Sequence, residues 1–526
     1  MKINYKCLGL VMFVMLICCV SAASATDVDN ITVPDDTGII EIDDTVDSVN
    51  DVEIEGTVDS VNDVEINDVE DSVGDAKNDD GSADNNGKEQ NLRRIPTING
   101  NPILYTYFTT NGYLRSFVGN TFTFSGDFTS LGNTFGNFKI DRTVTLNVAG
   151  ATFTNIGFDL LADNLTLNGA SFNVNARDGA NCYVIDIENA DNVIVSNNKI
   201  IYTCGYDNAA NYNYAIKAMN SENLTISGNE INATVPLKQP NWAVYGSIAS
   251  DYVAGVAIEN CTNFKFTGNN LTVIGDRRVG DYPTLDALII AKSKNAEISG
   301  NIIYETDVKT AEGQYSYIYG IDVYLCDNLI IKNNTVNMNG NKSGGNLVGG
   351  HGTGAAYCIQ LTGPHNGIVI SNNTLITRNQ GPNLGIYSQN YDGNTTLTIY
   401  GNHINVTGKA GSDPWSLVSG MELQDTNATV YDNVINVNNT AGYHANDYAF
   451  GISYAQSTSG SHYYDIHNNN VTVVNGDYAV YLLNSTFVTG QVIDNKLIAV
   501  TGSGNNTGNN AVSSLGLPYV LVSGNY

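Results

Sequence analysis

A short sequence phrase with an asparagine near its end recurs along most of this chain, and it constrains the fold more than any other feature. Typical copies are NLTISGNEI at 223–231 and NLIIKNNTV at 328–336. Successive copies lie 19 to 40 residues apart if the earliest, at Asp127, Ala151 and Ala170, are included. Such unequal spacing disfavours a propeller or a horseshoe, whose repeats are more regular. The landmark residues of the later copies are Asn198, Asn229, Asn269, Asn301, Asn334, Asn373, Asn402, Asn433, Asn469, Asn495 and Asn525.

A second phrase precedes the first at a fixed interval. One copy is YVIDIEN at 183–189, and its middle residue, Asp186, lies 12 residues before Asn198. Asp322 likewise lies 12 residues before Asn334. Two strands and the turn between them therefore keep a constant length, and the insertions fall elsewhere in the repeat.

The composition of the phrases indicates β-strands. Apolar residues alternate with Thr, Ser or Glu, which is the period of a strand with one buried face. The strands end at Gly-Asn or Asn-Asn pairs, which tolerate left-handed backbone angles. Strands with a fixed turn and variable loops predict an all-β coil whose rungs stack in parallel. At a rung spacing of about 4.8 Å, the landmark asparagines would form a ladder of side-chain hydrogen bonds.

The first 25 residues have the pattern of a secretory signal peptide. Lys2 and Lys6 precede a 13-residue apolar stretch at 8–20, and the motif ASA at 23–25 predicts cleavage before Thr26. The apolar stretch is too short to span a bilayer comfortably. A retained signal anchor is the alternative. We expect an exported protein that is extracellular or bound to the cell surface.

Residues 26–94 form an acidic, low-complexity leader. Positions 27–90 hold 22 Asp and Glu against Lys77 and Lys88 alone, and TVDSVNDVEI occurs twice with a period of 12. Acids separate the few apolar residues, so the leader is expected to be disordered and self-repelling. We interpret it as a solvated linker, with a cation-binding spacer across a cell wall as the alternative. The formal net charge of −29 disfavours nucleic acid as a partner.

From about residue 95 to residue 526 the chain resembles the single-stranded right-handed parallel β-helix proteins of the pectate-lyase-like superfamily. More narrowly, the signal peptide, acidic leader and Asn-rich repeats are similar to those of the adhesin-like surface proteins of methanogenic archaea. The resemblance implies a right-handed parallel β-helix (a solenoid) with variable loop insertions over 95–526. It leaves the function open, because the same repeat serves lyases, hydrolases, epimerases and adhesins.

An enzyme of this family would cluster acids and bases over adjacent rungs, and glycoside cleavage needs paired carboxylates. Ala257 and Ile289 interrupt the best candidate column, and a stacked acid–base pair is more often surface complementarity. Glu188 and Glu259 lie two residues beyond that column. We therefore predict no catalytic residue and no cofactor. The full column, in the strand before the fixed turn, is Asp186, Lys217, Ala257, Ile289, Asp322 and Gln360.

Other candidate ligands are isolated. His351 lies in the Gly-rich segment 344–354, which is predicted to be a flexible loop. Glu422 and Asp425 could bind Ca²⁺, but nothing completes the oxygen shell that this ion needs. We expect buried thiols. The alternative is up to two disulfides, which could include a Cys182–Cys204 pair. The cysteines after the signal peptide are odd in number and lack a CxxC spacing, so no zinc site is predicted: Cys182, Cys204, Cys261, Cys326 and Cys358.

Tyrosine is abundant, with 31 Tyr against 15 Phe. Many tyrosines lie in 206–214, 313–320 and 461–467, which we interpret as insertions. A flat ring with a hydroxyl group suits contacts with sugars and proteins. The alternative explanation is the preference of Tyr for strands.

Sequons of the form N-x-S/T are frequent, and export would make glycosylation feasible. Alternating Thr in Asn-rich strands also generates sequons by chance. The candidate positions are Asn164, Asn223, Asn232, Asn260, Asn270, Asn394, Asn405, Asn427 and Asn484.

These observations favour a non-catalytic, adhesin-like protein that binds extracellular glycans or surface proteins of other cells through its loops and a Tyr-rich surface. An extracellular polysaccharide lyase or hydrolase and a structural envelope protein are the alternatives. The sequence ends at Tyr526 inside a repeat, so an exposed strand edge is expected there. The anchor to the cell envelope is not identified.

Overall fold

The computed structural model describes residues 90–92 and 107–526 with interruptions. The chain divides into two units, Met1–Asn86 and Gly87–Tyr526, and every described residue belongs to the second. The predicted signal peptide and nearly all of the predicted leader lie outside the described residues, as do 110–111, 117–118, 131–135, 177–181, 205–211, 239–246, 251–252, 280–282, 308–315, 341–354, 380, 391–394, 412–416, 445–446, 456–461, 483–487 and 514–518.

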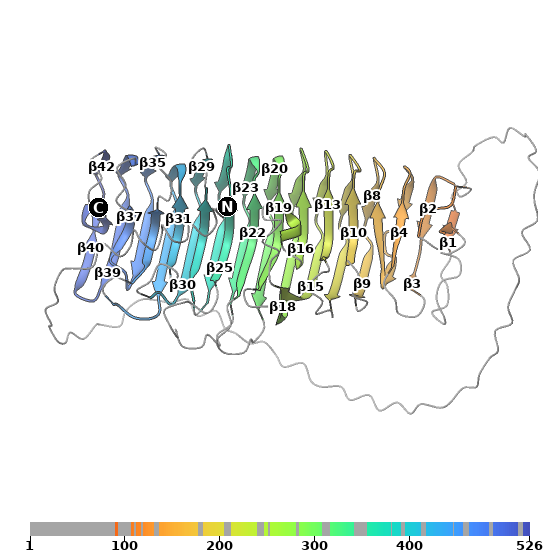
Figure 1. The fold of residues 1–526 in the computed structure, drawn as a ribbon, viewed down its shortest axis with the longest axis horizontal. Coiled ribbons are helices and arrows are strands. Elements are labelled where there is room, and N and C mark those ends of the chain that lie inside the picture. Colours follow the sequence, from red (N-terminus) through yellow and green to blue (C-terminus); the bar gives the residue numbers. More distant parts are fainter. Residues whose placement is uncertain are drawn as a thin grey trace, which may run out of the picture. The chain divides into compact units, whose positions relative to one another are not determined.

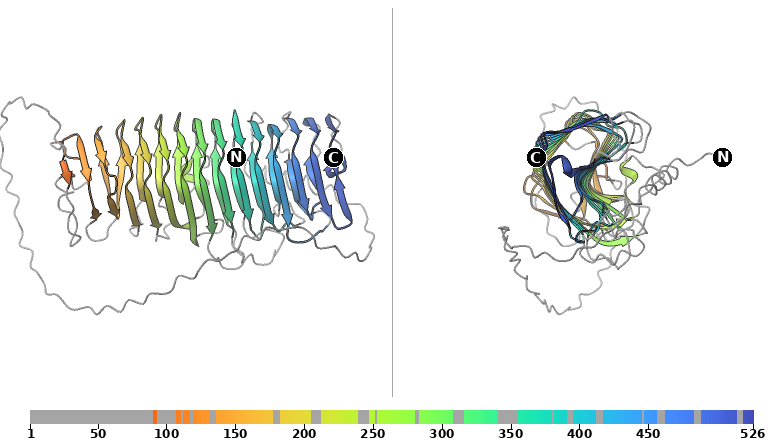
Figure 2. Two further views of the ribbon diagram at one scale, coloured as in Figure 1. Left: turned by 180° about the vertical axis from the view of Figure 1, so that it is seen from behind. Right: turned by 90° about the vertical axis from the view of Figure 1, so that its left-hand side faces the viewer.

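Each repeat contributes three strands, which stack on the equivalent strands of the next repeat. One repeat forms β13 (Asn213–Met219), β14 (Thr225–Ser227) and β15 (Glu230–Lys238). Each pairs in parallel with its successor, which is β16 (Val253–Glu259), β17 (Lys265–Thr267) or β18 (Asn270–Val279). The repetition builds three ladders (Figure 1), and the view along the stack shows that they enclose a common interior (Figure 2). The predicted all-β parallel β-helix is confirmed.

We number the ladders in chain order. Ladder 1 consists of β4 (Gly136–Ile140), β7 (Ile156–Leu160), β10 (Cys182–Glu188), β13, β16, β19 (Thr284–Ala291), β22 (Tyr317–Tyr324), β25 (Ala355–Thr362), β28 (Asn383–Gln389), β31 (Val418–Gln424), β34 (Ala449–Ala455), β37 (Tyr478–Leu482) and β41 (Val512–Ser513). Ladder 2 consists of β8 (Thr166–Asn168), β11 (Ile194–Ser196), β14, β17, β20 (Lys294–Ser299), β23 (Asp327–Lys332), β26 (Ile368–Ser371), β29 (Thr395–Tyr400), β32 (Thr426–Tyr431), β35 (His462–His467), β38 (Val488–Ile493) and β42 (Val520–Ser523).

Ladder 3 consists of β3 (Asp127–Thr129), β6 (Thr152–Thr154), β9 (Ser171–Ala176), β12 (Lys199–Cys204), β15, β18, β21 (Ile302–Asp307), β24 (Thr335–Asn339), β27 (Thr374–Arg378), β30 (His403–Gly408), β33 (Val434–Asn439), β36 (Asn470–Val474) and β39 (Lys496–Thr501). A separate parallel sheet joins β1 (Gln90–Leu92), β2 (Thr121–Phe124) and β5 (Thr145–Asn147). The remaining short elements are η3 (Ile248–Ser250), β40 (Gly504–Thr507) and η5 (Gly508–Ala511).

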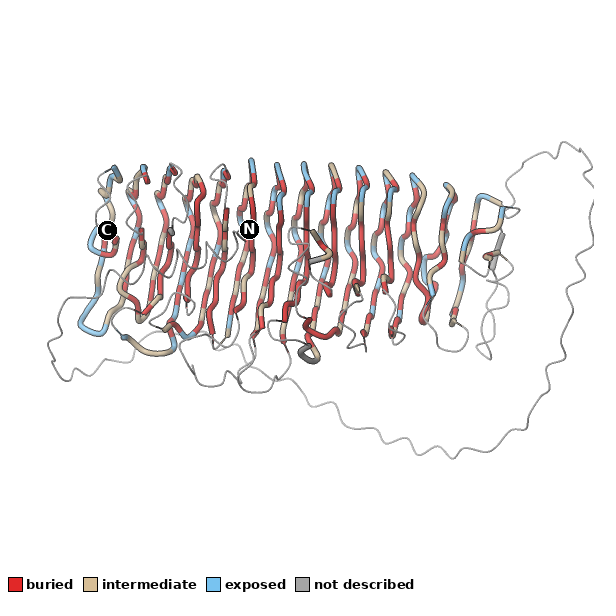
Figure 3. Tube along the Cα trace, in the orientation of Figure 1, coloured by how far each residue is buried: buried red, intermediate tan, exposed pale blue. Residues whose placement is uncertain are grey.

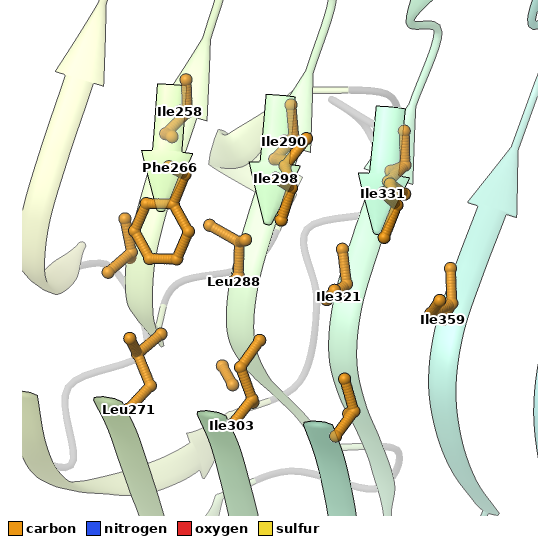
Figure 4. Close-up of a cluster of buried hydrophobic side chains, with 14 of the residues drawn as sticks. Ile258, Phe266, Leu271, Leu288, Ile290, Ile298, Ile303, Ile321, Ile331 and Ile359 are labelled. Atoms are coloured by element: carbon orange, nitrogen blue, oxygen red, sulfur yellow. The ribbon is translucent and has the colours of Figure 1, made fainter. Parts of the chain in front are cut away.

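The interior of the coil is filled by apolar side chains from all three ladders. Strands of ladder 3 alternate between buried and more accessible residues, which is why their sequences alternate (Figure 3). In the core, Ile290 of ladder 1, Ile298 of ladder 2 and Ile303 of ladder 3 face one another (Figure 4). Fully burying each such side chain contributes about 1.5–3 kcal/mol. The stacked apolar residues are therefore the main source of stability of the coil.

The turn between ladder 2 and ladder 3 explains the Gly-Asn and Asn-Asn pairs. The first residue of each pair has a left-handed backbone, with φ of 63° at Gly228 and 55° at Asn333. Glycine and asparagine adopt this conformation at low cost. The second residue is the landmark asparagine. Ten of the landmark asparagines, Asn198 to Asn495, are fully buried, and Asn525 is partly exposed.

The landmark asparagines are hydrogen-bonded in a continuous stack. Asn269 is typical: its Nδ2 donates to Oδ1 of Asn301 at 3.1 Å and to the Ile226 carbonyl at 2.9 Å. Its Oδ1 accepts from the backbone N and from Nδ2 of Asn229. Each buried amide thus has partners for both its donor and its acceptor, which removes the penalty of burying a polar group.

The strands of ladder 1 bend once, and the bend sets which residues share their outer face. Between β19 and β22 the paired residues are Asp286 with Tyr319 and Leu288 with Ile321, so one residue on each strand is skipped. The skipped residue of β22 is Gly320, where a Cβ would lie 2.8 Å from the Cys358 carbonyl oxygen. Across this bend the outward positions are three residues apart, as at Asp286 and Ile289, and beyond it they are two apart again, as at Ile289 and Ala291.

The described cysteines Cys182, Cys204, Cys261, Cys326 and Cys358 are all buried and free, so the open Cys182–Cys204 disulfide is not formed. Burial raises the pKa of the Cys261 and Cys326 thiols to about 12. Their neighbours at the same turn are hydroxyl groups: Ser293 Oγ accepts from the Cys261 backbone N at 3.1 Å. The thiols are small core residues in reduced form.

The last described rung covers part of the expected open edge. β40 runs antiparallel against β39 and covers its edge. Asn509 of η5 accepts hydrogen bonds from the backbone N and Nδ2 of Asn525, at 3.3 and 2.7 Å, and so continues the asparagine stack. The expectation is therefore wrong for ladder 3, whereas β42, the last strand before Tyr526, pairs only with β38 among the described strands and keeps an open edge. Within the described part of the chain, no helix is long and apolar enough to cross a membrane.

Candidate functional site

The outer face of ladder 1 carries the column of residues predicted from the sequence. The register pairs Asp186 with Lys217, Ala257 with Ile289, and Asp322 with Gln360, in the order of the sequence column. The column continues through Tyr387, Glu422, Ser453 and Tyr481. Apolar residues at its centre form a small outer cluster that includes Tyr214, Ala254, Ala257 and Ile289.

A buried ion network, the Lys217 cluster, lies at one end of this face. Lys217 Nζ is 3.2 Å from Asp186 Oδ1 and 3.2 Å from Glu188 Oε2, and it lies 4.6 Å from the centre of the Tyr183 ring. The side chains of Lys217 and Asp186 are 9% and 10% exposed. Burial raises the pKa of Asp186 to about 6 although Lys217 opposes the shift.

Asp159 extends this network by one rung, because it pairs in register with Asp186. Burial raises its pKa, and the Nδ2 group of Asn137, which donates to its Oδ1, partly offsets the rise. Asn137 also donates to the Tyr183 carbonyl at 2.9 Å. The sequence column began at Asp186 and missed this carboxyl, although FDL at 158–160 carries the same alternation.

Glu259 forms an ion pair with Lys292 and not with Lys217. Its Oε1 lies 2.7 Å from Lys292 Nζ, and its Oε2 accepts from Ser247 Oγ at 2.7 Å. Met219 lies between Glu188 and Glu259 in the ladder. The structure therefore separates Glu259 from the pair formed by Asp186 and Lys217.

Three fully buried acids lie near the middle of ladder 1, and sequence reasoning identified one of them, Asp322. Asp286 pairs with Tyr319 on the outer face. Glu305 of ladder 3 points into the coil, where burial raises its pKa well above the usual range while backbone hydrogen bonds from Ala287 and Tyr319 oppose the rise. The period of two from Ile303 could have revealed Glu305. The bend of the strand hid Asp286.

Towards the other end, aromatic residues collect on the outer face of β25 to β37. Leu384, Leu417 and Phe450 form a buried cluster against which partly exposed tyrosines pack. We call these tyrosines the tyrosine face: Tyr357, Tyr387, Tyr448, Tyr478 and Tyr481. Tyr357 and Tyr387 have ring centres 5.5 Å apart and are tilted by 49°, so neither ring face is fully covered by the other. Phe450 stacks on Tyr481 at 4.4 Å.

Glu422 is embedded in the tyrosine face. It pairs in register with Tyr387 on one side and Ser453 on the other, and Gln424 Nε2 donates to its Oε1 at 2.6 Å. Burial raises the pKa of Glu422 to about 7, and the hydrogen bond from Gln424 opposes the rise. This carboxyl group therefore titrates near neutral pH among aromatic rings.

The proposed partner of Glu422 in cation binding, Asp425, has other surroundings. It is fully buried and its Oδ1 lies 3.6 Å from His462 Nε2. Among the described side chains no group of three His, Cys, Asp or Glu residues is arranged to hold a metal ion. His351 lies outside the described residues.

The three Tyr-rich segments need a correction, because their described parts are strands rather than insertions. Tyr214 is buried on β13, Tyr319 lies on β22, and Tyr464 points into the coil from β35. The preference of Tyr for strands explains the error. The remainder of these segments lies largely outside the described residues.

The described sequon asparagines are all accessible to some degree. Asn164, Asn223, Asn260 and Asn270 are exposed, and Asn232, Asn405 and Asn427 are partly exposed. Some amides already donate hydrogen bonds: Nδ2 of Asn260 binds Asn220 Oδ1 at 2.8 Å. Asn394 and Asn484 lie outside the described residues.

No protein-family profile matches the chain, and a search of curated proteins finds no match. Among solved structures, PfbA, a surface adhesin of Streptococcus pneumoniae, is similar at a TM-score of 0.35 and 12% identity, over 77% of this chain and 92% of that one. The Dettilon tailspike protein gives 0.30 and 11%, over 64% and 62%. The catalytic domain of a GH87 alpha-1,3-glucanase in complex with nigerose gives 0.28 and 12%, over 82% and 70%. Similarities this distant carry no argument about function.

Proposed function

We propose that this protein is a secreted or cell-surface glycan-binding protein of the adhesin type, and that the tyrosine face is its binding surface. The observation that carries the proposal is the group of five partly exposed tyrosines on the outer face of ladder 1, which are Tyr357 on β25, Tyr387 on β28, Tyr448 just before β34, and Tyr478 and Tyr481 on β37. Strands of a ladder are about 4.8 Å apart. A linear polymer that runs along the ladder would meet a tyrosine at the rungs of β25, β28, β34 and β37, and Glu422 at the rung of β31.

The chemistry of the face suits sugars. A tyrosine ring offers flat apolar area to the C–H groups of a sugar, and its hydroxyl group can exchange hydrogen bonds with sugar hydroxyls. Gln360, Glu422, Gln424 and Ser453 lie on the same outer face and add donors and acceptors. Many weak contacts of this kind become effective when the protein is displayed in several copies.

Cleavage of a polysaccharide is the second candidate, and the raised pKa values of Asp159, Asp186 and Glu422 favour it. Such groups are typical of general acids. Against it, Lys217 binds both Asp186 and Glu188, so these carboxylates are engaged. Glu422 has no second carboxyl on the described strands beside it. We therefore favour binding without catalysis.

Export is part of the proposal and rests on the sequence of residues 1–25. The acidic leader would then hold the β-helix away from its point of attachment. Partners would be glycans or glycosylated proteins of other cells.

Binding of soluble polysaccharides tests the proposal, with Tyr387→Ala and Tyr481→Ala as the variants. We expect each substitution to weaken binding at least fivefold. Tyr463→Ala is the matched control, because Tyr463 is an exposed tyrosine on β35 of ladder 2. Equal affinity of all three variants and the unaltered protein would show that the tyrosine face is not the binding surface. Thermal unfolding of each variant excludes loss of the fold as the cause.

A further inference from the structure

We infer that the tyrosine face selects uncharged glycans, and that polyuronates and sulfated glycans are excluded from it. The inference rests on the proposed function and specifies its class of ligand. It follows from the charges on ladder 1 rather than from the tyrosines themselves.

No strand that carries the tyrosine face contains a cationic residue. The sequences of β25, β28, β31, β34 and β37 hold no Lys, Arg or His, and the two preceding strands, β19 and β22, also lack them. Proteins recognise carboxylate and sulfate groups chiefly with Arg and Lys. The described strands of this surface provide no such group.

The one carboxyl group on those five strands acts against an anionic ligand. The neighbours of Glu422 are Tyr387 of β28, Ser453 of β34 and Gln424 of its own strand. Its charge also acts on Tyr357 of β25. No cation is among these neighbours. Above neutral pH Glu422 is ionised, because its pKa is raised to about 7, so a ligand carboxylate beside it would be repelled.

The cations of ladder 1 lie elsewhere and already have partners. Lys217 is bound by Asp186 and Glu188, and Lys292 by Glu259. Lys139 lies 4.6 Å from the centre of the Tyr113 ring. Lys238 of β15, a strand of ladder 3, is buried where it pairs with Thr284 of β19. On the described strands of ladder 1 an anionic polymer would therefore find acids and paired cations, whereas the amide and hydroxyl groups suit sugar hydroxyls.

Matched polymers that differ in charge alone test this inference. Polygalacturonate and alginate are compared with their carboxyl-reduced forms, and neutral β-glucan and galactan complete the panel. Binding of the full chain is measured in about 10 mM salt, where the screening length is about 30 Å. We expect at least one carboxyl-reduced polymer to bind at least tenfold more tightly than its parent. Glu422→Gln should reduce that ratio, with thermal unfolding as a check on the fold.

The possible failures are distinguishable. If a parent polyuronate binds as tightly as its reduced form or more tightly, the inference is wrong and glycan binding itself stands. If no polymer in the panel binds, the proposed function fails and the inference falls with it. If Glu422→Gln leaves the ratio unchanged, Glu422 is not the source of the selectivity and that part of the argument is overturned.

Discussion

Asn198 donates its side-chain amide to the side-chain oxygen of Asn229 at 3.0 Å, and the same bond joins each landmark asparagine to the next as far as Asn525. Every inner member of this stack both donates and accepts, so each asparagine fixes the turn of its own rung and of its neighbours. The stack therefore transmits the register of the coil from rung to rung.

Removal of one inner asparagine should be costly. Asn301→Ala removes the Oδ1 that accepts from the backbone N–H and from Nδ2 of Asn269, and each buried donor left without its acceptor costs about 1–3 kcal/mol. We expect a loss of about 3 kcal/mol or more, measured by urea denaturation. Asn436→Ala is the control, because Asn436 is exposed and bonds only to Asn405 in the described surface. Equal effects of the two substitutions would contradict the role of the stack.

The Lys217 cluster should respond strongly to loss of its cation. Lys217→Met leaves Asp186 and Glu188 without their partner, and breaking a buried pair in this way costs about 3–5 kcal/mol. Adding Asp186→Asn should restore part of the lost stability, because one of the unpaired charges is then removed. Chemical denaturation of both variants measures this. A double variant that is less stable than Lys217→Met would refute the ion-pair account.

Glu422 should make stability depend on pH. Its pKa is raised from 4.5 to about 7 in the folded chain, so the folded state holds the proton more tightly than the unfolded state. Its contribution is therefore present below pH 4.5 and is lost as the pH rises through 7. The loss is on the order of 3 kcal/mol if the whole shift applies. The stability of Glu422→Gln relative to the unaltered chain should therefore increase as the pH rises from 4 to 8.

A parallel series with Glu297→Gln checks that result, because Glu297 is a more accessible acid on ladder 2 that pairs with Lys332. Side-chain hydrogen bonds from Ser299 and Lys332 lower the pKa of Glu297, so the sign of its effect is opposite. A pH dependence that is the same in the two variants would contradict the assignment to Glu422.

Affinity should rise with the length of a bound oligosaccharide. The tyrosine face extends over the five strands β25 to β37, which at one sugar per rung corresponds to about five units. Isothermal titration with a ladder of oligomers should show tighter binding up to about this length and little gain beyond it. Affinity that is independent of length from the disaccharide onward would show a compact pocket rather than an extended surface.

The repeat made the fold predictable because one interval, such as the 12 residues from Asp322 to Asn334, is kept while the loops vary. The columns of ladder 1 were harder to predict. The skipped residue at Gly320 shifts the outward positions by one, so alternation alone does not bring Asp286 onto the same face as Asp322. The clustering of Tyr387 and Tyr481 was also hidden, because sequence separation says nothing of how many rungs lie between two residues.

The most direct test of non-catalytic binding is the chain-length distribution of a neutral polysaccharide that the protein retains, measured after prolonged incubation with residues 91–526. The account predicts that the polymer is bound and keeps its original length. Shortened chains would contradict it, would establish a polysaccharide-cleaving activity, and would make Glu422, Asp186 and Asp159 the first residues to substitute.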